Sequence, residues 1–333
     1  MAGSERRATI LRRLRTVPLF LGGFLLATAA LPLLVAVSVA VDAVRWLMRR
    51  TPWMAIRLTF VLWLYLAVEA ACLAALVVTW LAVLGRRERL AGPAWALQAW
   101  WARVLFGALR RAFRIRFEVE GADEVAPGPI VVLMRHASII DNLVPANFVT
   151  APNGIRLRYI LKRELLSDPA IDIAGNRLPN VFVARGSDDA AREIERVRAL
   201  SEGLGPQEGM LIYPEGTRFT EAKRRRALEK LAASDEQLHA AAQRLHHVLP
   251  PRLGGPLALL DAGADVVVCA HQGLDGFSHI ADIWGGGLIG RKVTVRFRRF
   301  RHEEIPAGRE ARVEWLLARW QEVDDWIGAQ AAS

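Results

Sequence analysis

The segment from Arg135 to Asn142 contains residue types that can carry out acid–base chemistry. His136 and Asp141 are separated by four residues. A histidine acts as a general base when one ring nitrogen is free and a carboxylate holds the other, because the carboxylate fixes the tautomer and supports the transient positive charge. The alternative interpretation is a histidine at the end of a strand and an aspartate that caps a helix, with no chemistry between them.

A second segment, Tyr213-Pro-Glu-Gly-Thr-Arg218, has the composition of an anion-binding loop. Gly216 allows a tight turn whose amides converge on an anion. Thr217 adds a hydroxyl donor, and Arg218 adds a planar fork that suits phosphate. Glu215 is expected to orient an arginine or the loop backbone. The alternative is a Pro-Gly turn followed by a surface arginine.

Two shorter segments complete the set of candidates. Arg185 ends an apolar run that starts at Val181, and it is followed by a glycine, so it could meet the same anion. The segment from Val248 to Arg252 contains two prolines and by itself would be interpreted as a loop.

Short strands that alternate with helices must position these residues. The apolar run 129–134 predicts a buried strand just before His136, and this alternation from residue 114 onward predicts an α/β domain of roughly 220 residues. The other expected strands are 116–120, 157–161, 181–184, 210–213, 266–270 and 293–297, and the expected helices are 188–204, 221–246 and 310–327.

The N-terminal third is far more apolar than the rest. The run 17–41 has no charged residue, and the run 58–84 has only Glu69, which we expect to face the first helix or to be protonated. Each run is long enough to cross a bilayer as a helix. A signal peptide is excluded because its apolar core is shorter, about 7–15 residues, and because a second apolar run follows. A hairpin that enters one leaflet is also compatible with the arginines around both runs.

Composition favours a membrane lipid as partner over nucleic acid. The chain is 53% hydrophobic, which is too apolar for an ordinary soluble enzyme, and its net charge is +10. A basic protein can bind nucleic acid, anionic lipid or phosphorylated substrates, and the apolar runs select lipid.

The two cysteines, Cys72 and Cys269, make a disulfide framework or a cysteine-based zinc site improbable. His246, His247 and His271 lack acidic partners at metal-ligand spacing.

In their order and spacing, the four segments resemble the 1-acylglycerol-3-phosphate O-acyltransferase (lysophosphatidic acid acyltransferase) family over about residues 114 to 300. That family has a His-x-Ser-x-x-Asp block, a strand that ends in Phe-x-x-Arg, a Phe/Tyr-Pro-Glu-Gly-Thr-Arg block and a proline-containing strand. The matching positions are His136, Ser138, Asp141, Phe182, Arg185, the whole of 213–218, and Arg252 with Gly255; Lys162, Leu165, Pro169 and Gly175 match a run common before the second block.

The resemblance implies an α/β fold with a mixed sheet flanked by helices, and direct acyl transfer from a thioester of coenzyme A or acyl carrier protein to lysophosphatidic acid or a related lysolipid, which gives phosphatidate. It assigns the catalytic role to His136 and Asp141. It assigns phosphate binding to Arg185 and to Glu215, Gly216, Thr217 and Arg218. Further candidates for substrate contact are Arg135, Ser138, Lys162 and Arg252. No metal or redox cofactor is implied.

One residue departs from the family pattern. Arg135 stands where the family usually has Asn, so it could steer an anionic acceptor or mark a subgroup with another acceptor. One alternative function is the same chemistry on another lysophospholipid or lipid acceptor. Another is a non-catalytic membrane lipid-binding protein with the same fold.

We expect three regions and a membrane location. They are a membrane-anchoring helical hairpin at 1–90, an interfacial Trp-rich helix at 91–113 and the α/β acyltransferase domain at 114–333. The preference for Arg over Lys suggests a GC-rich bacterial genome. The distribution of arginines around the two runs predicts an inner-membrane protein with its catalytic domain in the cytoplasm.

Overall fold

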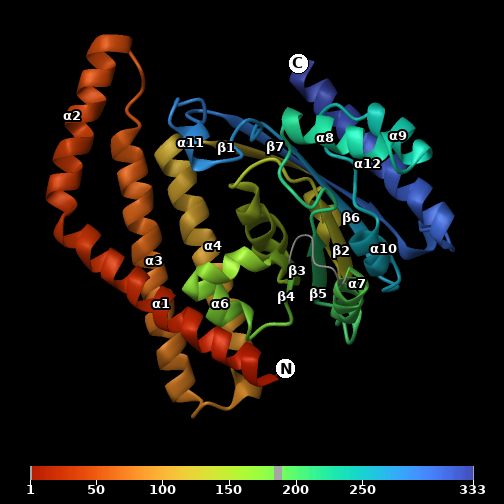
Figure 1. Ribbon diagram of the computed structural model, residues 1–333, viewed down its shortest axis with the longest axis horizontal. Coiled ribbons are helices and arrows are strands. Elements are labelled where there is room, and N and C mark those ends of the chain that lie inside the picture. The colour runs from red at the N-terminus through yellow and green to blue at the C-terminus, as the bar shows by residue number, and fades with distance from the viewer. Residues whose placement is uncertain (1, 184–189, 333) are drawn as a thin grey trace. The chain divides into compact units, whose positions relative to one another are not determined.

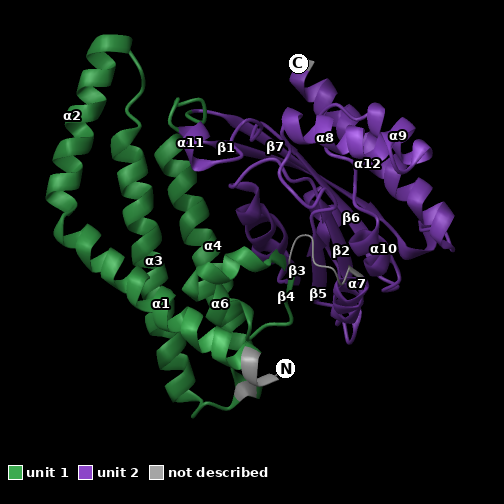
Figure 2. Ribbon diagram, viewed as in Figure 1, with its two compact units in different colours: residues 1–114, 161–185, 284–289 green, residues 115–160, 186–283, 290–333 purple. Residues whose placement is uncertain are grey.

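The computed structural model describes residues 2–183 and 190–332. They form two compact units, which Figure 2 distinguishes by colour. The first unit contains residues 1–114, 161–185 and 284–289, and the second contains 115–160, 186–283 and 290–333. A compact unit is not necessarily an independent domain. The domain boundaries expected at residues 90 and 113 therefore stay predictions.

The second unit is built on a mixed sheet, as the sequence predicts. Its strands follow the order β1-β7-β6-β2-β5-β3, and the last two residues of β3 belong to the first unit (Figure 1). The pairing between β6 and β7 is antiparallel, and the other pairings within this order are parallel. The bounds are β1 Arg116–Glu120, β2 Ile130–Met134, β3 Arg156–Lys162, β5 Glu208–Ile212, β6 Asp265–Gln272 and β7 Lys292–Phe300; β4, Val181–Val183, belongs to the first unit.

Strand β2 occupies the interior of this sheet because all five of its residues are apolar. Each of them is fully buried. Leu133 lies opposite Ile212 of β5, and Met134 lies opposite Cys269 of β6, in parallel register. The carboxyl ends of these three strands therefore meet at one edge, which is where ligands commonly bind in α/β sheets. The segments that start at Arg135 and Tyr213 leave the sheet at this edge.

Helices flank the sheet of the second unit. Helix α10 contacts β2 and β5, and α12 contacts β6. The predicted single helix at 221–246 is wrong, because α8 ends at Ala232 and the side chain of Asp235 accepts a hydrogen bond from Leu238 N to begin α9. Short polar side chains favour helix caps over helix interiors. The bounds are α5 Ala151–Asn153, α7 Ala190–Arg198, α8 Glu221–Ala232, α9 Glu236–Gln243, α10 Gly254–Leu260, α11 Ile280–Ile283 and α12 Arg309–Ala332.

Helix α12 fixes the chain segment that leads to Arg252. The buried carboxylate of Asp324 accepts hydrogen bonds from the backbone amides of residues 246–248. The indole of Trp320, also fully buried, donates to Leu249 O at 3.0 Å. The tail helix thus does more than cover the sheet, since it satisfies the backbone of a loop that has no strand partner.

The first unit is helical. Its helices are α1 Ala2–Ala29, α2 Leu31–Arg49, α3 Ala55–Ala82, α4 Ala91–Phe113 and α6 Pro169–Gly175. The prediction of one continuous helix over 17–41 is wrong, because the chain breaks at Ala30 and α2 starts with Pro32 in its first turn. Proline lacks an amide hydrogen and is tolerated in a first helical turn, so a new helix begins there.

Two buried acids organise these helices. Asp42 of α2 accepts hydrogen bonds from the amides of Met54, Ala55 and Ile56 at 2.9–3.0 Å, and it thereby caps α3. Glu69 of α3 accepts from the indole of Trp101 in α4 at 2.6 Å and from Ala170 N in α6. Glu69 therefore faces α4 and α6, and the expectation that it faces the first helix is wrong.

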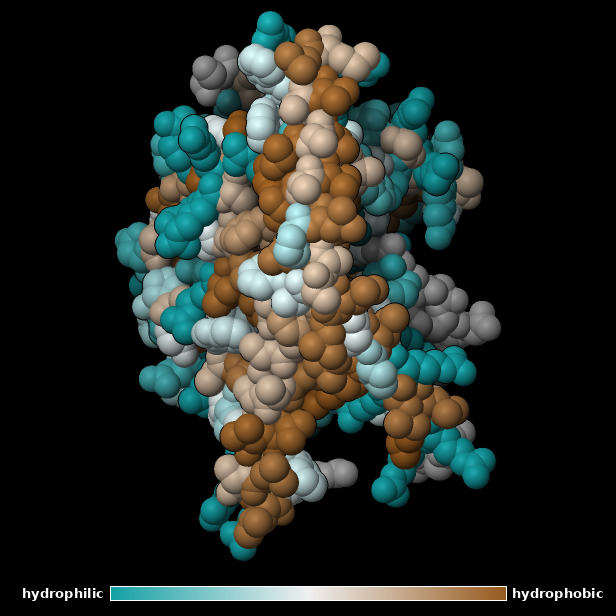
Figure 3. All heavy atoms as spheres, turned by 90° about the vertical axis from the view of Figure 1, so that its left-hand side faces the viewer, coloured by the Kyte–Doolittle hydropathy of each residue, from teal (hydrophilic) through white to brown (hydrophobic). Residues whose placement is uncertain are grey.

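The outer face of the first unit is apolar. Within the described part of the chain, α2 and α3 are the helices long and apolar enough to cross a membrane, by length and composition. Large apolar side chains such as Leu26, Leu62 and Val78 are more than half exposed. Figure 3 shows brown side chains along the face that α1 to α3 form.

Candidate active site

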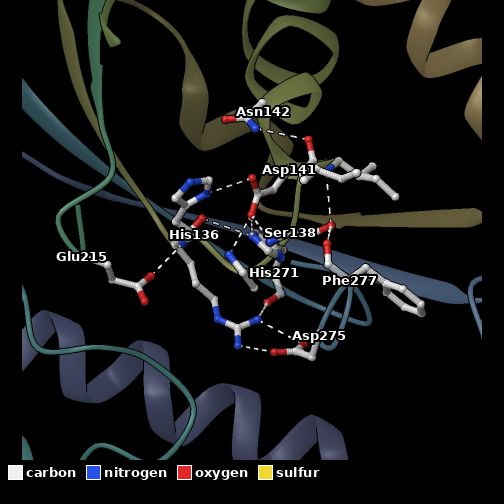
Figure 4. Close-up of polar contacts among 12 residues, drawn as sticks. His136, Ser138, Asp141, Asn142, Glu215, His271, Asp275 and Phe277 are labelled. Carbon is white, nitrogen blue, oxygen red and sulfur yellow. Dashed lines mark hydrogen bonds and ion pairs between the residues drawn. The ribbon is translucent and has the colours of Figure 1, made fainter. Parts of the chain in front are cut away.

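The structure brings His136 and Asp141 into direct contact. His136 Nδ1 lies 3.0 Å from Asp141 Oδ1, and the carboxylate is fully buried (Figure 4). The other carboxylate oxygen accepts hydrogen bonds from the amides of Ala137 and Ser138, each at 2.7 Å. The turn after β2 therefore wraps its own backbone around Asp141, which a short 3₁₀ helix at Asp141–Leu143 brings back toward the histidine.

Charge on Asp141 decides the histidine tautomer. Burial raises the pKa of Asp141, but the attraction of His136 and the hydrogen bonds from His136 and His271 outweigh it and hold the pKa below its ordinary value. An ionised carboxylate only accepts hydrogen bonds, so Nδ1 carries the proton and Nε2 carries the lone pair. Among residues 2–183 and 190–332, Nε2 has no hydrogen-bond partner, and the side chain is 14% exposed.

Two residues that the sequence analysis did not assign to the site support this pair. The Tyr213 ring, just after β5, packs on the imidazole of His136 with centroids 4.3 Å apart. His271 on β6 is fully buried, and its Nε2 lies 3.1 Å from Arg135 O and 3.5 Å from Asp141 Oδ2. Tyr213 begins the predicted loop and was within reach of sequence reasoning. His271 depends on the pairing of β6 with β2, for which the sequence carries no signal.

Arg135 points into the protein and offers nothing to a substrate. Its side chain is fully buried. Its guanidinium donates to the carbonyls of His271 and His247, each at 2.7 Å, and forms an ion pair with Asp275. The expectation that Arg135 contacts the acceptor is therefore not supported by its position. Instead, Arg135 joins the start of the turn after β2 to the loop after β6.

Ser138 and Glu215 also hold the backbone of the site. The fully buried hydroxyl of Ser138 donates to Phe277 O and accepts from Ile140 N. Glu215 accepts from His136 N at 2.7 Å and from Leu249 N at 2.9 Å, so it joins three loops. Burial raises the pKa of Glu215 to about 8, against the opposing effects of Arg135 and the two amides. A carboxyl with this pKa is largely protonated near neutral pH, so Glu215 adds little negative charge to the loop 213–218.

The turn at Gly216 presents two arginines. Gly216 has a φ of 65°, and a Cβ there would lie 2.8 Å from Cδ and Nε of Arg252, so glycine allows the Arg252 side chain to cross the turn. Arg252 is exposed, and it has no side-chain hydrogen bond or ion pair with any described residue. Arg218 is half-buried and uses one nitrogen to donate to Ser278 O. Thr217 is half-buried beside it.

The structure describes one of the two remaining candidates. Arg185 falls outside the described residues. Lys162 belongs to the first unit, where its ammonium lies 2.8 Å from a Glu164 carboxylate oxygen. Within the described chain, no group of three or more His, Cys, Asp or Glu residues is placed to hold a metal ion.

We expect Arg135→Ala to reduce stability without a specific loss of acceptor binding. The substitution leaves Asp275 and two buried carbonyls without their donor, which costs at least about 2 kcal/mol. Thermal unfolding of the purified protein in detergent measures this loss, and acceptor KM at a temperature where the variant is folded is expected to stay within about twofold. A KM increase of tenfold with unchanged stability would show that Arg135 contacts the acceptor after all.

The stability contributed by Asp141 is expected to depend on pH. Its folded-state pKa is lower than the ordinary value of 3.8, so the contribution is complete above pH 3.8 and decreases as the pH falls toward the folded-state pKa. Wild type should exceed Asp141→Asn in unfolding midpoint at neutral pH, and the gap should narrow below about pH 3.8. A gap of constant size from neutral pH to about pH 2.5 would contradict an ionised Asp141.

The comparisons with known proteins each find acyltransferases. Residues 116–254 match the family model Acyltransferase. The chain is 31% identical over 199 residues to mouse 1-acyl-sn-glycerol-3-phosphate acyltransferase gamma, covering 59% of this chain and 51% of the relative. It is 23% identical over 240 residues to mouse lysocardiolipin acyltransferase 1, covering 69% and 61%.

A crystal structure of the 1-acyl-sn-glycerophosphate acyltransferase PlsC from Thermotoga maritima matches with a TM-score of 0.44 and 17% identity, covering 71% of this chain and 80% of that one. The chain spans about half the length of the mouse gamma enzyme that it matches. The family model covers the stretch that carries both His136 and the loop 213–218. Residues 116–254 of this chain are therefore similar to the Acyltransferase family.

Proposed function

We propose that this protein is a membrane-bound acyltransferase that moves an acyl chain from a thioester to the free hydroxyl of 1-acylglycerol-3-phosphate, giving phosphatidate. The observation that carries the proposal is His136, whose Nδ1 is held by the ionised Asp141 while its Nε2 is left available as a base. The anion-binding loop supports it, because Phe219 N donates to His136 O at 2.7 Å and so joins loop and base directly.

The reaction balances with these groups alone. His136 Nε2 takes the proton from the acceptor hydroxyl while the oxygen attacks the thioester carbonyl carbon. The C–S bond then breaks, and the imidazolium returns its proton to the departing thiolate. Asp141 holds the tautomer and stabilises the imidazolium throughout, and Tyr213 limits rotation of the ring.

The acceptor phosphate is assigned to the turn at Gly216 with Arg218 and Arg252. Arg218 keeps guanidinium donors beyond the one that Ser278 uses, and Arg252 has no side-chain partner among the described residues. Arg185, whose position the structure does not describe, is proposed to bind the same phosphate. The reacting hydroxyl lies a few bonds from the phosphate, so binding the anion also orients the nucleophile.

The names of the relatives support two acceptor classes. The mouse gamma relative is named for 1-acylglycerol-3-phosphate, and the lysocardiolipin relative matches over a larger share of this chain. Another lysophospholipid is therefore the second candidate acceptor. The donor is proposed to be a thioester of coenzyme A or acyl carrier protein. The location is proposed to be a bacterial inner membrane with the catalytic residues in the cytoplasm, anchored through the apolar helices of the first unit.

Turnover by the full-length protein tests the base. His136→Ala should lower kcat by at least about 10²- to 10⁴-fold, and Asp141→Ala by nearly as much, because the pair acts as a unit. The double variant should be little worse than either single one. Thiol release from an acyl thioester in the presence of lysophosphatidate is the measurement. More than a tenth of wild-type activity in a folded His136→Ala protein would exclude the proposed base.

Arg218 should decide which acceptor is used. Arg218→Ala is expected to lower kcat/KM for lysophosphatidate by tenfold or more, since a charge-assisted hydrogen bond contributes about 1.5–3 kcal/mol. Arg218→Lys should recover only part of this, because lysine cannot form a bidentate contact. An acceptor without a phosphate monoester should be a poor substrate for wild type, and the substitution should leave its use nearly unchanged.

Arg226→Ala is the matched control, because Arg226 is an exposed arginine on α8. It should leave both acceptors unaffected. If Arg218→Ala lowers kcat/KM equally for both acceptors, Arg218 serves the fold or the donor, and the phosphate assignment is wrong.

A further inference from the structure

An apolar groove lies on the first unit between α2, α3 and the end of α4. Its cavity volume is about 630 Å³, which is within the usual range of small-molecule sites. The lining side chains are mostly large and apolar, and several come from successive turns of α2 and α3. They are Leu31, Val35, Trp53, Ile56, Thr59, Phe60, Trp63 and Ala112, together with one charged residue, Arg57.

Arg57 is half-buried in this groove without a counter-ion. Its Nε donates to Trp53 O at 2.9 Å, and its Nη1 donates to Ala112 O near the end of α4. Carbonyl oxygens carry only partial charge, so these bonds orient the guanidinium without neutralising it. Within the described residues, no carboxylate forms an ion pair with Arg57, and its Nη2 has no hydrogen-bond partner.

The nearby acid is already committed to other groups. Asp42 accepts three backbone amides at the start of α3 and lies 3.7 Å from Arg45. An unpaired charge is expensive to bury, and its cost falls when an opposite charge binds it. The groove therefore combines an apolar channel with a cation that needs an anionic ligand.

We propose that this groove is a binding site for an anionic diacyl phospholipid, whose phosphate pairs with Arg57 and one of whose acyl chains lies along Leu31, Val35, Phe60 and Trp63. Charge complementarity selects an anionic lipid over a zwitterionic one. The neighbouring side chains match a headgroup boundary, because Trp46 and Trp53 are exposed and the Arg50 guanidinium lies 4.3 Å from the Trp46 ring. The site is separate in its residues from the proposed acyl-transfer site.

Photo-crosslinking of the full-length protein tests this proposal. The protein is reconstituted in phosphatidylcholine nanodiscs that contain a trace of phosphatidylglycerol with a diazirine in one acyl chain. A phosphatidylcholine probe with the same diazirine chain serves as the neutral comparison. Mass spectrometry of the labelled peptides should place the phosphatidylglycerol label on residues 31–63, with about tenfold more labelling than the phosphatidylcholine probe gives.

Variants separate the site from general attraction to basic residues. Arg57→Gln should remove the preference for phosphatidylglycerol, and Arg57→Lys should retain part of it. Arg49→Gln makes the same charge change at an exposed residue at the end of α2 and should leave the preference intact. Val35→Trp keeps Arg57 but fills the groove, so it should lower labelling by both probes even if Arg57→Gln does not fold.

Three labelling results would overturn the proposal. They are equal labelling of residues 31–63 by the two probes, equal losses in Arg49→Gln and Arg57→Gln, and unchanged labelling in Val35→Trp. Competition by lysophosphatidate but not by unlabelled phosphatidylglycerol would also overturn it, because the groove would then be a substrate site.

Discussion

The structure of the candidate site depends on a carboxylate that stays ionised inside the protein core. Asp141 is fully buried, and burial alone would protonate it. Two backbone amides, His136 and His271 supply the opposing attraction. In the observed conformation, the turn after β2 points two of its own amides at the carboxylate. The same hydrogen bonds therefore fold the turn and orient the candidate base.

Three side chains that the sequence suggested as substrate contacts form hydrogen bonds with the protein instead. They are Ser138, Glu215 and Arg135. Ser138 and Arg135 join the turn to the loop after β6, at Phe277 and Asp275, and Glu215 joins it to Leu249. Loops at a sheet edge lack strand partners, so their amides and carbonyls must be satisfied by side chains. Arg218 and Arg252 are therefore the described arginines of the motifs that keep guanidinium donors not used by any other described residue.

The first unit resolves buried charge in another way. Asp42 and Glu69 lie among apolar helices and are satisfied by amides and an indole. Arg57 is oriented by two carbonyls but meets no carboxylate among the described residues. A lipid phosphate would complete this arrangement in the way that Asp42 completes the start of α3. An apolar outer face and an arginine without a carboxylate partner can occur together when lipid surrounds the helices.

The sequence by itself determined the fold class, and it indicated the residues that form the candidate site. The strand before His136, the spacing to Asp141 and the order of the motifs were readable because strands and turns carry local patterns. Local pattern did not predict the break at Ala30 or the division of 221–246 into α8 and α9, where a proline and a capping aspartate interrupt otherwise helical sequence. Only the tertiary structure decided that Arg135 turns inward and that His271 meets Asp141. Both facts depend on β6 lying beside β2, and strand pairing brings together residues more than a hundred positions apart, which no short pattern encodes.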